Sequence, residues 1–147
     1  MNGYMLDTNI YNHVLDGGIN PKTLPKVSIF YTFEQPDELQ KTKNIERRDD
    51  LLSVFQLCDP SETMVSTFVL GNARLDKTQL GDGVLFSEIR KRLDSRKKKD
   101  NNLIDALIAE SSYLNGLTLV TDDCCLEAVC FEMGIPVISL HQFLNLS

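Results

Sequence analysis

The sequence has few of the residues on which most nucleophilic and zinc sites depend. Among its 147 residues are two histidines and four cysteines. Neither His13 nor His141 has a candidate partner in sequence for a catalytic triad. The cysteines include no C-x2-C pair and have no ligating histidine nearby, so they do not predict a zinc site. No glycine pair precedes Lys-Ser or Lys-Thr, which excludes a P-loop. We expect reduced thiols that are mostly buried as small apolar groups.

Long apolar runs and targeting segments are also lacking. No run approaches the roughly 20 apolar residues that a membrane-spanning helix requires, and the N-terminus has no basic segment followed by an apolar one. The 42% hydrophobic and 24% charged content is ordinary for a globular protein. The chain contains no internal repeat and no low-complexity linker. We therefore expect one domain over residues 1–147, cytoplasmic and without a membrane partner.

Negative charge dominates, but it is unevenly distributed. The net charge is −6, whereas residues 90–99, RKRLDSRKKK, hold seven of the fifteen Lys and Arg and one acid. This local charge of +6 leaves −12 on the rest of the chain. A basic strip beside an acidic body suits a nuclease, because the basic strip attracts phosphates and the acidic body attracts divalent cations. Alternatively, the strip is a solvated helix end and loop. The candidate RNA contacts are Arg90, Arg92, Arg96, Lys97, Lys98 and Lys99.

The stretch from Asp100 to Asp123 organises the rest of the chain. Apolar residues recur at three- and four-residue steps from 103 to 114, which predicts a helix that ends at Asn115-Gly116. Residues 117–120, LTLV, then predict a short buried parallel strand. Asp122 and Asp123 follow that strand, at the edge where ligands bind in open parallel sheets.

Strands and helices alternate through the remainder of the chain. Further strands are expected at 4–6, 27–31, 62–68 and 137–138, further helices at 8–15, 36–55, 84–93 and 126–133, an irregular segment at 71–83, and a closing segment at 140–144. Strands separated by helices imply right-handed crossovers and a parallel sheet covered on both faces. The sequence therefore predicts an α/β fold.

Four carboxylates are expected to meet at one edge of this sheet. Asp7 ends the first strand, Glu38 and Asp105 lie near the starts of helices, and Asp123 follows a strand. Such a cluster carries strong repulsion unless a cation lies within it. Mg²⁺ or Mn²⁺ suits all-oxygen ligands, and a metal held in this way can orient a water for attack on a phosphodiester.

Each of these acids also has a purely structural interpretation. Asp7 and Asp123 could cap the helices that follow them. Glu38 could complement a helix dipole, and Asp105 lies at a capping-box-like spacing from Asn102. The joint occurrence of the four acids on these elements is what favours a metal site.

The chain resembles the PIN-domain ribonucleases nearly end to end, most closely the VapC-type toxins and their single-domain prokaryotic relatives. The similar segments are MLDTNI at 5–10, YTFEQPDELQKT at 31–42, NIERRDDLL at 44–52, DALIAE at 105–110, LVTDDCCL at 119–126 and GIPVISLHQFL at 134–144. LVTDDCCL matches a Leu-Val-Thr-x-Asp-x-x-Leu segment of the family. Residues 71–83 have no counterpart that aligns.

The resemblance implies a three-layer αβα sandwich around a mostly parallel sheet, and an endoribonuclease that cleaves single-stranded RNA with a water bound to Mg²⁺ or Mn²⁺. It implies Asp7, Asp105 and Asp123 as metal ligands and Glu38 as a ligand or base. Glu34 lies close to Glu38, but the pairing of Glu38 with a following leucine favours Glu38. The resemblance adds Asp122 as a neighbouring ligand, and Asn9 and Thr121 as supporting polar residues.

The family resemblance also implies partners and leaves alternatives. Toxin members usually form homodimers and are inhibited by an antitoxin protein. A catalytically idle PIN fold that binds RNA or protein is one alternative, although retention of the four acids favours the nuclease. A phosphoreceiver or a haloacid-dehalogenase-like phosphatase is another. A phosphoreceiver would need paired acids directly after its first strand, and a haloacid-dehalogenase-like phosphatase would need an Asp-x-Asp motif. The sequence Asp7-Thr8-Asn9 provides neither.

Overall fold

The structure is a computed structural model that describes residues 3–32, 34–63, 67–70, 73–76, 84–97 and 102–146. Its elements are, in chain order, β1 (Gly3–Leu6), α1 (Thr8–Asp16), η1 (Pro21–Thr23), β2 (Ser28–Tyr31), α2 (Glu34–Gln40), α3 (Ile45–Cys58), β3 (Ser61–Glu62), β4 (Thr67–Leu70), β5 (Ala73–Asp76), α4 (Val84–Arg96), α5 (Asn102–Leu114), β6 (Thr118–Val120), α6 (Cys124–Met133), β7 (Val137–Ile138) and α7 (Leu140–Leu144). Among the described helices, none has both the length and the apolar character of a membrane span.

Five parallel strands form the central sheet, in the order β3-β2-β1-β6-β7. The first strand, β1, is therefore in the middle, and the chain winds outward from it in both directions. The backbone N–H of Asp7, directly after β1, donates to the carbonyl of Val120 at the end of β6 over 2.9 Å. These two strand ends lie where the winding direction reverses, which is the usual ligand site of open α/β sheets.

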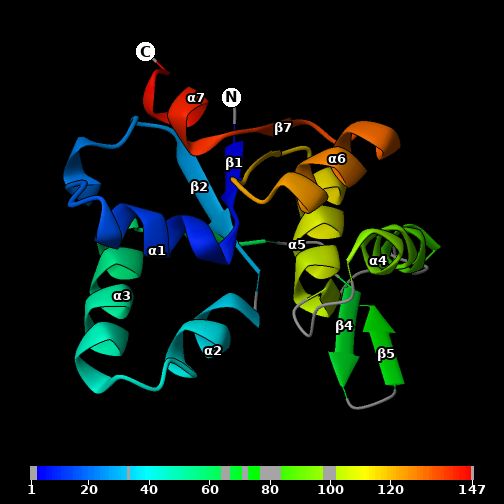
Figure 1. The fold of residues 1–147 in the computed structure, drawn as a ribbon, viewed down its shortest axis with the longest axis horizontal. Coiled ribbons are helices and arrows are strands. Elements are labelled where there is room, and N and C mark those ends of the chain that lie inside the picture. Colours follow the sequence, from blue (N-terminus) through cyan, green and yellow to red (C-terminus); the bar gives the residue numbers. More distant parts are fainter. Residues whose placement is uncertain are drawn as a thin grey trace.

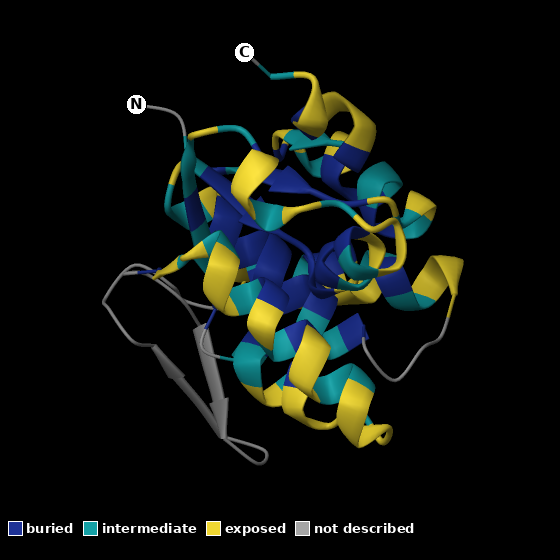
Figure 2. Ribbon diagram, turned by 90° about the vertical axis from the view of Figure 1, so that its left-hand side faces the viewer, coloured by how far each residue is buried: buried dark blue, intermediate teal, exposed yellow. Residues whose placement is uncertain are grey.

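The central strands alternate their side chains between two cores. On β1, Met5 joins one core, while Tyr4 and Leu6 join the other. On β6, Leu119 and Val120 divide in the same way. Successive residues of a strand point to opposite faces, so a strand that is apolar throughout must be covered on both sides. Figure 2 shows these strands buried inside the molecule and the outer faces of the helices exposed.

Two groups of helices cover the two faces of the sheet (Figure 1). The Met5 core is completed by apolar residues of α4, α5 and α6, and the Leu6 core by residues of α1, α2, α3 and α7. The predicted αβα sandwich around a parallel sheet is therefore confirmed. Figure 1 also shows α2 and the first turn of α5 at the same end of the sheet as the end of β1.

The single helix expected over 36–55 is wrong, because this segment contains two helices. The side chain of Asn44 accepts from the backbone N–H of Arg47 over 3.0 Å and caps the start of α3. The preceding helix, α2, begins at Glu34, so Pro36 falls in its first turn. A proline there loses no hydrogen bond, because the first N–H groups of a helix have no partner within the helix.

Two further predictions are wrong. They are the single strand over 62–68 and the irregular segment over 71–83. In the described part of this segment, Ser61–Glu62 joins the main sheet as β3, while Thr67–Leu70 pairs antiparallel with Ala73–Asp76 in a separate two-stranded sheet. In sequence, Gly71-Asn72 separates these two strands, and a two-residue pair of this kind is typical of a hairpin. Residues 64–66, 71–72 and 77–83 lie outside the described part of the chain.

Candidate metal centre

Asp7 follows β1 and occupies the N-cap position of α1, yet its side chain makes no capping hydrogen bond. Its Oδ2 instead accepts from the hydroxyl of Thr121 over 2.9 Å. The residue is only 3% exposed. A carboxylate buried in this way is costly unless polar or cationic groups compensate its charge. The interpretation of Asp7 as a simple helix cap is therefore not supported.

Thr121 joins the ends of two strands to the start of a helix. It is fully buried, and its hydroxyl both donates to Asp7 and accepts from the backbone N–H of Asp123 over 3.1 Å. Its own N–H donates to the carbonyl of Ile138 on β7. Because the Thr121 hydroxyl donates one hydrogen bond and accepts another, it holds the Asp7 carboxylate in a defined position relative to Asp123.

Asp123 caps α6, as its structural interpretation predicts. Its Oδ1 accepts from the N–H groups of Cys125 at 2.8 Å and Leu126 at 3.2 Å. The helix consequently begins at Cys124, two residues earlier than expected. An ionised carboxylate has about four lone-pair sites on its two oxygens, so a capping role does not prevent Asp123 from also binding a cation.

Glu38, on α2, lies close enough to Asp7 for the charge of Asp7 to affect its carboxyl. Burial, and then repulsion by Asp7, raise the pKa of the Glu38 carboxyl from 4.5 to about 7, while Lys41 acts in the opposite direction. Its Oε2 is buried and has no hydrogen-bond partner. Buried polar atoms almost always have a partner, so this oxygen is a candidate ligand atom for a cation.

Gln35 anchors α2 beside the end of β1 and was missed by the sequence analysis. It is fully buried, and its amide donates to the carbonyl of Leu6 over 2.7 Å and to the hydroxyl of Thr8 over 3.4 Å. Its Oε1 accepts from the backbone N–H of Thr32 over 2.9 Å. The Thr-x-x-Gln spacing of residues 32–35 is that of a capping box, and this signal could have revealed both Gln35 and the true start of α2.

Asp105 lies in the first turn of α5 and is 5% exposed. Burial, and then the charges of Asp7, Asp105 and Glu127, raise the pKa of the Cys130 thiol to about 12. The carboxylates of Asp7 and Asp105 therefore act on the same buried sulfur. Asn102, proposed above as a capping-box partner of Asp105, is itself the first residue of α5, and its amide donates to Asp94 and to the Lys97 carbonyl.

Asp122 and Asn9 are placed differently from these acids. Asp122 is exposed, with Oδ2 at 3.1 Å from Nδ1 of His13 and Oδ1 accepting from the backbone N–H of Leu140 over 3.0 Å. His13 therefore has a partner, which sequence spacing did not reveal. Asn9 is exposed in the first turn of α1. The side chain of Asp122 therefore links His13 on α1 to the start of α7.

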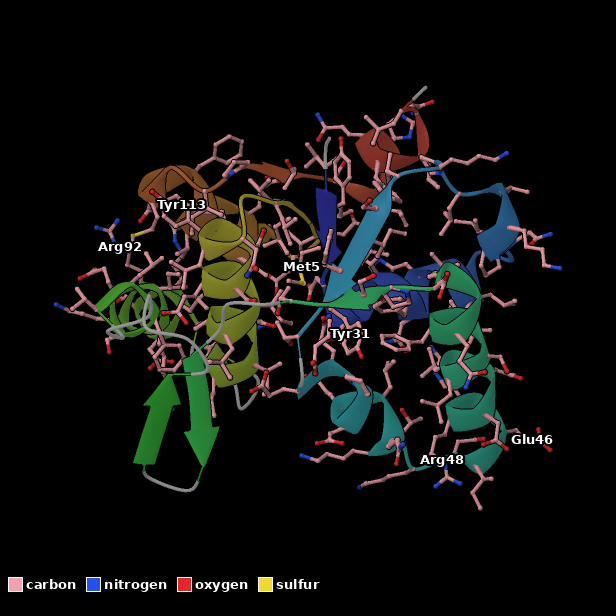
Figure 3. All side chains as sticks on the ribbon, turned by 180° about the vertical axis from the view of Figure 1, so that it is seen from behind. Met5, Tyr31, Glu46, Arg48, Arg92 and Tyr113 are labelled. Carbon is pink, nitrogen blue, oxygen red and sulfur yellow. The ribbon has the colours of Figure 1, made fainter. Side chains whose placement is uncertain are left out.

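The basic strip lies largely on α4, which extends to Arg96 and not only to residue 93. Arg92 pairs with Glu88 at 2.9 Å and with Glu132 at 3.0 Å, and Arg96 also pairs with Glu132. Figure 3 shows Arg92 on the outer side of the helix. Arg90 and Lys97 are exposed, whereas Lys98 and Lys99 lie outside the described residues. An open hollow of about 490 Å³ is lined by Phe86, Ser87, Arg90, Lys91, Asp94 and Ser95.

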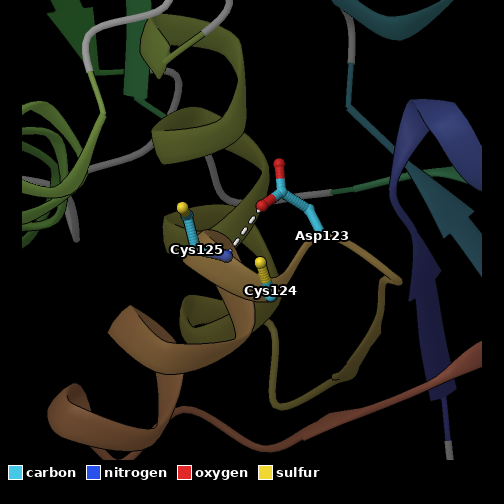
Figure 4. Close-up of side chains that lie close together, drawn as sticks. All are labelled: Asp123, Cys124 and Cys125. Atoms are coloured by element: carbon cyan, nitrogen blue, oxygen red, sulfur yellow. Dashed lines mark hydrogen bonds between the residues drawn. The ribbon is translucent and has the colours of Figure 1, made fainter.

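The four cysteines are free, but only Cys130 is fully buried. Cys58 and Cys125 are partly exposed and Cys124 is exposed, so the expectation of mostly buried thiols is wrong. Asp123, Cys124 and Cys125 form a group of potential metal ligands whose donor atoms all lie within 4.8 Å of one another (Figure 4). It is the group of three or more such ligands found within the described residues. Among these described residues, no three of the four carboxylates of Asp7, Glu38, Asp105 and Asp123 form such a group.

Comparison with solved structures gives clear fold neighbours. One is a chain of VapBC2 from Rickettsia felis bound to a DNA fragment from their promoter, with a TM-score of 0.55, 18% identity and coverage of 93% of this chain and 98% of that chain. Another is a chain of VapBC-1 from nontypeable Haemophilus influenzae, with a TM-score of 0.57, 18% identity and coverage of 93% and 97%. No protein-family model and no curated protein sequence matches the chain.

The chain accordingly has the PIN fold of these neighbours. The similarity extends over nearly the full length of both chains, and the five-stranded parallel sheet with helices on both faces agrees with it. At 18% identity the comparison concerns the fold, and the chemistry must be argued from the side chains themselves.

Proposed function

We propose that this protein is a divalent-metal-dependent endoribonuclease that hydrolyses single-stranded RNA at the carboxylates of Asp7, Glu38, Asp105 and Asp123. The observation that carries the proposal is the environment of Glu38. Its Oε2 is buried without a hydrogen-bond partner, beside the negative charge of Asp7. A buried acid beside another acid is costly to ionise, and a bound cation would offset that cost.

The donor set fits Mg²⁺ or Mn²⁺. The four side chains offer only carboxylate oxygens, which these hard cations prefer. Asp7, Asp105 and Asp123 would hold the ion directly or through water, with Glu38 as a further ligand or as a base. When bound, the ion would supply an activated water and stabilise charge on the phosphate. Asp122 is left outside this set, because its two oxygens already face His13 and the Leu140 N–H.

The protein's own groups orient the reaction. Thr121 restrains the Asp7 carboxylate through its hydroxyl, and Gln35 ties α2, and with it Glu38, to the end of β1. A general base must be ionised to accept a proton from water, and in the metal-free protein the pKa of the Glu38 carboxyl is about 7. Cation binding would lower that pKa, since it favours the charged form.

RNA binding is proposed for the exposed cations of α4. Arg90, Lys91 and Lys97 are exposed, whereas Arg92 and Arg96 have carboxylate partners in Glu88 and Glu132. Binding gains chiefly from cations that are available to neutralise phosphates and so release counterions from the nucleic acid, and the exposed residues should therefore contribute most. This refines the six basic candidates that were taken from sequence.

A toxin–antitoxin setting is part of the proposal. It is supported by the resemblance to VapC-type toxins and by the fold shared with chains of VapBC structures. In this setting an antitoxin protein would bind the chain and suppress cleavage, and the chain would form a homodimer. Light scattering of the purified chain would measure its oligomeric state. Purification from native cells should retain a second small protein whose removal increases cleavage.

Cleavage of a labelled single-stranded RNA tests the nuclease proposal. The wild type should cut in Mn²⁺ or Mg²⁺ and stop in EDTA. Asp7→Asn and Asp105→Asn should each lower the cleavage rate by about 100-fold or more. Loss of a residue that only hydrogen-bonds to a metal ligand typically lowers activity by about 10–100-fold, and loss of the ligand itself should lower it further. Asp37→Asn, an exposed acid of the same α2, is the matched control and should cut normally.

Failure of the folded wild type to cut any of a varied RNA set would favour the idle binding module. Calorimetric titration with Mn²⁺ then separates the two possibilities. A protein that neither cuts RNA nor binds Mn²⁺ through Asp7 has no metal centre, and the proposal fails.

A further inference from the structure

The start of α6 carries a second kind of ligand set beside the carboxylates. One carboxylate oxygen of Asp123 and the sulfurs of Cys124 and Cys125 all lie within 4.8 Å of one another. Figure 4 shows these three side chains around the first turn of the helix. Cys124 is exposed and Cys125 is partly exposed, so both residues are accessible from solvent.

We propose that Asp123, Cys124 and Cys125 form a binding site for a thiophilic metal ion such as Zn²⁺ or Cd²⁺. Two sulfurs and one carboxylate oxygen suit these softer ions and not Mg²⁺ or Mn²⁺, which prefer oxygen alone. Two thiolates bound to one tetrahedral zinc lie about 3.8 Å apart, given bonds of about 2.3 Å. Donor atoms already within 4.8 Å of one another therefore need only small side-chain rotations to bind one ion.

Three protein ligands leave the fourth tetrahedral position for water. The local charge also favours this site. The ligands lie at the N-terminal turn of α6, where the helix dipole stabilises anionic groups such as a carboxylate and thiolates. The other two cysteines lack this combination, because Cys130 is buried and Cys58 ends α3.

The site has a consequence for the proposed nuclease, and this step rests on the proposed function. Asp123 belongs to both ligand sets, and its backbone N–H is linked through the Thr121 hydroxyl to Asp7. A thiophilic ion that takes Asp123 would withdraw it from the catalytic cation. Zn²⁺ or Cd²⁺ is thus expected to inhibit Mn²⁺-dependent cleavage at concentrations far below those of the activating metal.

Cadmium binding to the reduced, full-length chain tests the site independently of catalysis. Ultraviolet charge-transfer absorption from sulfur to Cd²⁺ should saturate at one ion per chain. Cys124→Ser and Cys125→Ser should each weaken Cd²⁺ affinity by more than about 100-fold, because a direct ligand is lost. Cys58→Ser should leave the absorption and affinity unchanged. Absence of the charge-transfer band in the wild type, or equal bands in all three variants, would overturn the site.

A second measurement tests the regulatory consequence. For each protein, RNA cleavage in Mn²⁺ is expressed as the ratio of rates with and without Cd²⁺. Inhibition of the wild type and of Cys58→Ser, with resistance of Cys124→Ser, would support competition for Asp123. Equal inhibition of all three would overturn it. If no protein cuts RNA, the nuclease proposal fails while the charge-transfer titration still reports on the site.

Discussion

The hydroxyl of Thr121 donates a hydrogen bond of 2.9 Å to Oδ2 of Asp7, although the two residues are 114 positions apart in sequence. The same hydroxyl accepts the N–H of Asp123 over 3.1 Å. One buried oxygen therefore connects two of the proposed metal ligands. The geometry of the centre should depend on this oxygen more than on the rest of the Thr121 side chain.

Replacing Thr121 with valine should reduce both stability and metal affinity. Thr121→Val keeps the shape but removes the hydroxyl, which leaves the Asp123 N–H and an Asp7 oxygen without that partner. We expect a loss of about 1–3 kcal/mol in the free energy of unfolding, measured in urea. Affinity for Mn²⁺ should fall by about 10–100-fold.

Thr121→Ser is the control for the hydroxyl, because serine retains the oxygen and loses a methyl group. It should bind Mn²⁺ nearly as tightly as the wild type. Equal Mn²⁺ affinities for the valine and serine variants would show that the hydroxyl does not position the ligands.

Glu38 should make the metal-free protein less stable as pH rises. Its pKa is about 7 in the folded state and 4.5 ordinarily, so between these values the folded state binds more protons than the unfolded state. This stabilising contribution is complete below the ordinary pKa and is lost as pH rises through the folded value. Urea unfolding in EDTA at pH 5 and pH 8 measures it.

Glu38→Gln should flatten that pH dependence and be more stable than the wild type at pH 8, because it removes a buried charge beside Asp7. Glu46→Gln, an exposed acid at the start of α3, should retain the wild-type profile. Saturating Mn²⁺ should restore stability to the wild type at pH 8, since a ligand that binds the folded state stabilises it. A wild-type profile for Glu38→Gln would refute the assignment of a raised pKa.

Gln35 should be important for stability despite having no place among the acids. Gln35→Ala leaves the Leu6 carbonyl and the Thr32 N–H without their partner inside the protein. We expect a loss of about 1–3 kcal/mol in the free energy of unfolding. Because Glu38 follows Gln35 on α2, Mn²⁺ affinity should fall as well.

Gln40→Ala provides a matched control on the same helix, since Gln40 is exposed. Thermal and urea unfolding of this variant should match the wild type closely. If both alanine variants unfolded alike, Gln35 would not be the anchor of α2.

The basic residues of α4 should differ in their contribution to RNA binding. Each of Arg90→Ala and Lys91→Ala should weaken binding to single-stranded RNA and reduce the slope of log affinity against log salt by about 0.7. Arg92→Ala should change this slope less, because its guanidinium is engaged by Glu88 and Glu132. Fluorescence anisotropy over a range of salt concentrations, in EDTA, measures the slopes without cleavage.

A slope change for Arg92→Ala equal to that for Arg90→Ala would show that RNA displaces the glutamates. In that case the whole basic strip, and not its exposed members alone, would contact the phosphates.

Much of the fold was predictable from sequence because it depends on short-range patterns. The apolar residues of 117–120 and the three- and four-residue periodicity of 103–114 gave β6 and α5, and Asp7 and Asp123 were located correctly at strand ends. The break between α2 and α3 was missed, although Asn44 is a good N-cap residue. The β4–β5 pair was missed because the run 62–68 was taken as one strand.

Tertiary structure alone determined how the candidate acids are used. Their positions in sequence do not reveal that Asp122 turns toward His13 while Asp7 turns toward Thr121, since these partners are 109 and 114 residues apart. The elevated pKa of Glu38 likewise arises from burial and from the charge of Asp7 on another element. Sequence places acids at strand ends and helix starts, whereas packing across the sheet sets their hydrogen bonds, burial and mutual repulsion.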